Sequence, residues 1–156
     1  MRERKAPSGS GLFLIELLFG LLIFALTAAV CLQIFVGSHR ISNESNRLNH
    51  AVVMAQNGAE CFKASGGDVR NTAMLIKGHL YSDDVVFKYF DSEWNSVFTI
   101  LFDEAGKATN AAYVLEIRRF PEQNGHIVIA GEAVVSDVAG HVIFSIPVAA
   151  LNREAL

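Results

Sequence analysis

The chain has 156 residues, about half of them apolar, and a formal net charge of −3. This length accommodates one small domain and a membrane helix. The acidic balance, with no basic stripe, argues against tight binding of nucleic acid through charge. No Ser/His/Asp set, Cys/His pair, metal-ligand spacing or phosphate-binding glycine loop can be placed, so we expect no enzyme activity, cofactor or metal.

The N-terminus has a short basic leader followed by a long apolar run. Residues 2–5 read Arg-Glu-Arg-Lys, residues 7–11 are small or proline, and residues 12–36 are almost entirely apolar. At about 1.5 Å per residue, these 25 positions form a helix of roughly 37 Å, long enough to cross a bilayer with some tilt. The basic flank predicts a cytoplasmic N-terminus, with residues 37–156 on the other side of the membrane.

Glu16 is the only carboxylate in the apolar run. A carboxylate there costs roughly 2.5–3.5 kcal/mol on insertion scales, so an intramembrane acid is a functional hypothesis by default. The alternative is an acid near a helix end that reaches the membrane interface.

Gly11 followed by Leu12-Phe-Leu-Ile-Glu16-Leu resembles the cleavage and methylation signature of type IV prepilins and pseudopilins. The resemblance covers about residues 2–37. It implies that a prepilin peptidase cuts after Gly11, removes leader 1–11 and methylates the new amine of Leu12. Glu16 would then pair with the N-terminal amine of a neighbouring subunit. Cleavage would remove three basic residues and one acidic residue, leaving 10 against 15, a net charge of −5.

The helix is expected to continue from the membrane half, 12–36, into an amphipathic half, 37–64. If it is continuous, Cys31 and Cys61 lie about 45 Å apart, too far for a disulfide, which needs Cα atoms within about 7 Å. Ser65-Gly66-Gly67 supplies a stop signal. The expected apolar stripe consists of Ile41, Leu48, Val52, Ala55, Ala59 and Phe62.

The remaining chain, 65–156, predicts a short helix and then strands. The helix occupies 68–80, capped by Asp68. Trp94 lies in a turn, where it could make an external contact or pack beneath the sheet. The pattern therefore predicts an α+β, pilin-like fold: a long helix against an antiparallel sheet of four to five strands over 85–148. The strands are expected at 85–90, 96–102, 112–120, 126–137 and 140–146.

Three functions follow as alternatives. The first is a structural pilin or pseudopilin, which would wait in the membrane lipid and join other subunits on an assembly platform. Its filament would serve adhesion, motility, protein secretion or DNA uptake. The second is a priming or tip subunit that binds a surface or DNA. The third is an uncleaved membrane-anchored domain. The absence of proline between Pro7 and Pro121 favours a minor subunit within the family.

Overall fold

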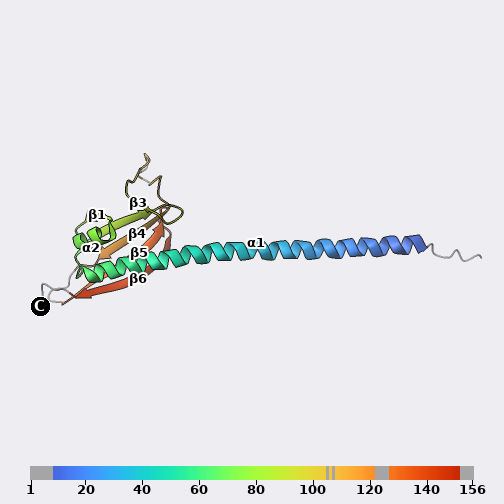
Figure 1. Cartoon of the computed structure of the whole chain (residues 1–156), viewed down its shortest axis with the longest axis horizontal. Helices are drawn as coiled ribbons and strands as arrows, with labels where there is room; N and C mark the ends of the chain where they lie inside the picture. Colours follow the sequence, from blue (N-terminus) through green and yellow to red (C-terminus); the bar gives the residue numbers. More distant parts are fainter. Residues whose placement is uncertain (1–8, 105, 107, 122–126, 152–156) are drawn as a thin grey trace, which may run out of the picture. The chain divides into compact units, whose positions relative to one another are not determined.

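The computed structural model describes residues 9–104, 106, 108–121 and 127–151. The chain divides into two compact units, residues 1–45 and residues 46–156, and the long helix α1 contributes to both. We call the second unit the head. The elements in chain order are α1 (Gly9–Ala64), α2 (Val69–Ile76), β1 (His79–Ser82), β2 (Val85–Phe90), β3 (Ser96–Val97), β4 (Tyr113–Arg119), β5 (Val128–Asp137) and β6 (Val142–Leu151) (Figure 1).

The N-terminal unit contains the apolar part of α1. The helix begins at Gly9, three residues before the predicted start at Leu12. Side chains from Leu12 to Val36 are exposed. By length and composition alone, α1 is able to cross a membrane.

Within the head, small residues on α1 pack against the sheet. Ala51, Ala55, Ala59 and Phe62 are buried. Of the predicted stripe, Ile41 and Leu48 are instead exposed. The prediction followed the helical spacing of apolar residues, whereas the sheet packs against small side chains that let the helix backbone approach it closely. A Cβ on Gly58 would lie 3.0 Å from Ile117 Cδ1, and one on Gly131 would lie 3.1 Å from Phe62 Cζ.

The predicted antiparallel sheet is confirmed, with six strands rather than four or five. Its order is β1-β2-β4-β5-β6, and β3 pairs with β2 beside β1. All strand pairs are antiparallel. Alternate residues face α1 and form the core, among them Val86, Phe90, Leu115, Ile117, Ile129, Ala133, Val135, Val148 and Ala150.

The helix predicted over 68–80 ends earlier, at Ile76. Asp68 caps it as expected, accepting hydrogen bonds from the backbone N–H of Arg70 and Asn71. Lys77 adopts a left-handed conformation with φ 54°, which stops the helix. Gly78 then passes so close to β2 that a Cβ would lie 2.8 Å from the Phe87 carbonyl oxygen. His79 and Leu80, predicted as the end of this helix, belong to β1 instead.

The strand predicted over 96–102 is reduced to Ser96 and Val97. β1 already pairs with β2 over Val85–Phe87, so only the last three residues of β2 are left on that edge, and β3 pairs with two of them, Tyr89 and Phe90. The chain then leaves the sheet in a loop closed by an isolated bridge between Phe102 and Ala108.

The last hairpin differs from the prediction at both of its strands. The strand predicted over 126–137 runs from Val128, and the one predicted over 140–146 runs from Val142 to Leu151. β6 is an edge strand and therefore accommodates Pro147. Proline has no backbone N–H, so it cannot donate the hydrogen bonds that an inner strand makes on both sides. His126, the predicted start of the first of these strands, lies outside the described residues.

Candidate functional site

The predicted processing site lies within the first turns of α1. Gly11 and Leu12 are helical, and Glu16 is one turn further along. Leu12 and Glu16 are four residues apart, so their Cβ atoms lie on the same helical face with an axial separation of about 6 Å. The structure therefore places the carboxylate about one turn from the amine that cleavage would create.

Glu16 also shares a face of α1 with Gly20, Thr27 and Cys31, whereas the remaining small or polar residues of the apolar run lie on other faces, namely Ala25, Ala28, Ala29 and Gln33. At 100° per residue, Glu16, Gly20, Thr27 and Cys31 project within an arc of about 60°. A Cβ on Gly20 would meet nothing within 4 Å. Thr27 Oγ1 donates to the Phe24 carbonyl at 2.9 Å, which satisfies its hydroxyl inside the helix. We call these four residues the polar face. Small and polar residues of this kind are enriched where membrane helices contact one another.

The polar face was missed from the sequence, although Glu16 itself was found. The signal in the sequence is helical spacing. The members of the polar face are 4, 7 and 4 residues apart, and each of these steps brings the side chain back to nearly the same direction around the helix axis.

Both cysteines are free thiols, and no bridge joins them. Cys61 donates weakly to Asn57 Oδ1 across 3.6 Å. Burial raises the pKa of the Cys61 thiol, and the nearby charge of Lys88 opposes this only partly. Burial also lowers the pKa of Lys88, whose Nζ lies 5.5 Å from the centre of the Phe90 ring. Cys61 thus lies at the edge of the core, where its raised pKa disfavours the thiolate.

Three acids of the head loops, Asp83, Asp84 and Asp91, have structural partners. Asp83 pairs with Arg70 at 2.8 Å, and Asp84 pairs with Arg119 at 2.8 Å. Asp91 accepts hydrogen bonds from two backbone N–H groups of its own turn. Among the described residues, no group of three or more His, Cys, Asp or Glu side chains is arranged to hold a metal ion.

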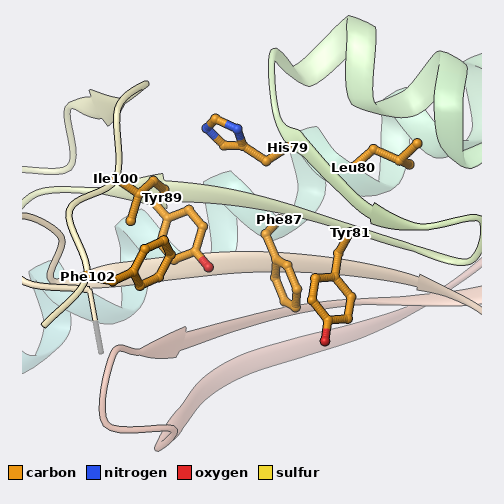
Figure 2. Close-up of a pocket in the computed structure, with 7 residues that line it drawn as sticks. All are labelled: His79, Leu80, Tyr81, Phe87, Tyr89, Ile100 and Phe102. Atoms are coloured by element: carbon orange, nitrogen blue, oxygen red, sulfur yellow. The ribbon is translucent and has the colours of Figure 1, made fainter. Parts of the chain in front are cut away.

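The outer face of the sheet carries an aromatic hollow that the sequence did not reveal. Figure 2 shows its lining from β1, from β2 and from the loop after β3. The rings of Tyr81 and Phe87 meet edge to face at 5.5 Å, and those of Phe87 and Tyr89 lie 6.2 Å apart. The hollow has a volume of about 310 Å³ and is lined by His79, Leu80, Tyr81, Phe87, Tyr89, Ile100 and Phe102.

The sequence showed no aromatic patch because these residues are distributed over 24 positions, from His79 to Phe102. Strand alternation brings Phe87 and Tyr89 to one face, and the antiparallel pairing of His79 with Phe87 adds β1 beside them. Comparison with family models, curated proteins and solved structures found no match to this chain.

Proposed function

We propose that the chain is a pilin-like structural subunit, cleaved after Gly11 and assembled into a filament through its apolar helix. The observation that carries this proposal is the position of Glu16. It lies in an apolar, exposed helical segment, one turn after Leu12, and on the same face as Gly20 and Thr27.

Cleavage after Gly11 would leave a charged amine on Leu12 near the carboxylate of Glu16. Each charge alone is costly in lipid, and pairing across two subunits offsets part of that cost for both. Subunits in register would bring Glu16 of one copy to Leu12 of the next. The polar face around Glu16 supports close helix contact at this position.

The proposed topology follows from the sequence flanks. In this proposal the N-terminus lies in the cytoplasm, α1 in the inner membrane and the head outside, because basic residues flanking a membrane helix favour the cytoplasmic side. The prepilin peptidase, other pilin subunits and the assembly platform are the proposed partners. Because no proline interrupts α1, a minor subunit is favoured over a major one.

The second candidate is a tip or priming subunit that acts as a binding module. The aromatic hollow of Tyr81, Phe87 and Tyr89 is the specific observation that favours it. Binding of a surface ligand by the isolated subunit, lost on Tyr81→Ala, would distinguish this function from a purely structural one.

The test is the mass of the N-terminal peptide from cells that express the full chain with a prepilin peptidase. We expect a peptide that begins at Leu12 and carries one added methyl group. The Gly11→Ala variant should retain its leader while still inserting into the membrane, and cells without the peptidase provide the control. An unprocessed wild-type chain would identify an uncleaved anchor and overturn the proposal.

A further inference from the structure

An apolar surface of the head extends from α2 across the aromatic hollow to the loop after β3. Leu80 borders both the hollow and a second depression on α2, formed with Ala73, Met74 and Lys77. We call this second depression the α2 socket. At the other end, the hollow is lined by Ile100 and Phe102 (Figure 2). Large contiguous apolar surfaces are uncommon on monomeric proteins and mark interaction sites.

The loop after β3 presents exposed apolar side chains on a fixed backbone. Phe98, Leu101 and Phe102 are each about 60% exposed. Asn110 holds the loop: its Oδ1 accepts from Leu101 N–H at 2.9 Å, and its Nδ2 donates to the Thr99 carbonyl at 2.6 Å. We call Phe98, Leu101 and Phe102 the apolar knob. Because these hydrogen bonds already hold the backbone of the loop, binding of a partner to the knob loses little additional conformational entropy.

The two ends of this surface carry opposite charges. Asp103 and Glu104 follow the knob directly and are exposed. The α2 socket is bordered by Lys77 and by Arg70, whose charge is shared with Asp83. Lys77 forms no ion pair with any acid among the described residues, so it is the cation available to a partner.

We infer that the apolar knob of one copy docks in the α2 socket of a second copy, with Glu104 facing Lys77. The inference rests on the proposed function, because a filament is what brings heads together in one repeating orientation. A knob and a socket are different surfaces, so the contact is heterologous, and heterologous contacts build open chains unless the rotation closes a ring. A second copy is favoured over an unrelated partner because the chain itself carries both halves of the contact. The apolar knob complements the apolar α2 socket, and Glu104 complements Lys77.

Cysteine cross-linking of the full chain in membranes tests this contact. In a Cys31→Ser, Cys61→Ser background, Leu101→Cys combined with Met74→Cys should give a ladder of multimers on mild oxidation. Either cysteine alone should give little product. The matched control pairs Met74→Cys with Leu151→Cys, because Leu151 and Leu101 are similarly exposed.

A charge swap tests the role of Lys77. Added to the cross-linking pair, Lys77→Glu should lower the ladder yield roughly fivefold, because like charges then meet across an exposed contact. Glu104→Lys alone should do the same, and the two together should restore the yield. A folding defect would not be rescued by the second substitution.

Two results would overturn the inference: no product above the control pair, or dimers without higher multimers, which would indicate a closed two-fold contact. The N-terminal mass is measured on the same samples. Normal cleavage with no ladder therefore rejects only this contact, whereas an uncleaved chain rejects the proposed function.

Discussion

Trp94 stacks on Tyr113 with ring centroids 4.0 Å apart and an interplanar angle of 7°. His50 of α1 lies nearly parallel to the same indole, with a centroid distance of 5.5 Å. Trp94 therefore connects the helix, the turn after β2 and the start of β4. The open question of the sequence, an external contact or packing beneath the sheet, is answered in favour of packing against the core.

Replacing Trp94 by alanine should destabilise the head by about 3 kcal/mol, the lower end of the range for this change, since the indole is only partly buried. Chemical unfolding of the full chain followed by circular dichroism measures this, because Trp94 is the single tryptophan and fluorescence is lost with it. Phe98→Ala is the matched control: its ring is 60% exposed, and we expect a change within about 0.5 kcal/mol. Equal effects of the two variants would contradict the packing role.

The sequence predicted the broad fold because the strongest signals are local. The apolar run, the glycine stop at Gly66 and the cap at Asp68 each depend on neighbours within a few residues. β1 was missed since the apolar pattern of α2 continues through Leu80, whereas its end is set by Lys77 and by the approach of Gly78 to Phe87. β3 was overestimated because the number of free positions on β2 is a tertiary property.

The candidate sites also divide into one that depends on local sequence and one that depends on tertiary structure. Gly11, Leu12 and Glu16 form a linear motif, so sequence alone identifies them. The aromatic hollow depends on the pairing of His79 with Phe87 and on the path of the chain beyond Val97. These relationships arise from strand register, which alternation within one strand does not specify.

Gly131 should not tolerate a side chain. A Cβ there would lie 2.7 Å from the Arg118 carbonyl oxygen and 3.1 Å from Phe62 Cζ, and the backbone atom cannot move without disturbing β4. We expect Gly131→Ala to lower the free energy of unfolding of the head by about 2 kcal/mol. In Gly37→Ala the new methyl meets nothing within 4 Å, so the denaturant midpoint of the head should remain unchanged. A stable Gly131→Ala head would show that helix and sheet separate easily.

Asp137 should make the β5–β6 hairpin sensitive to acid. Its carboxylate accepts from the backbone N–H of His141 and of Ala139, both at 2.9 Å, and the His141 contact is the main cause of its lowered pKa. A lowered pKa means that the stabilisation is present above the unfolded-state value of about 3.9 and disappears as the pH falls through the folded-state pKa.

The stability difference between wild type and Asp137→Asn should therefore be largest above about pH 5 and should shrink below about pH 4. Denaturant unfolding at a series of pH values measures it, with Glu93→Gln as an exposed control in another turn. A difference that stays constant down to the acid limit would mean that the charge of Asp137 is not what its backbone donors stabilise.

Glu16→Gln tests the pairing argument at the N-terminus without altering the cleavage motif. Glutamine keeps the size and hydrogen-bonding oxygen of glutamate but removes the charge, so it is less costly in lipid and cannot neutralise the amine of Leu12. We expect normal processing in cells that carry the peptidase, together with at least a severalfold loss of subunit from sheared filaments. The control is Glu60→Gln on the same helix, where the acid is exposed and pairs with Lys63. Quantitative immunoblotting of sheared and cell-bound fractions measures incorporation, and N-terminal mass measures processing. If Glu16→Gln subunits enter filaments as efficiently as Glu60→Gln subunits, the charge of Glu16 does not set the register between subunits, and the polar face around Gly20 and Thr27 must act through packing alone.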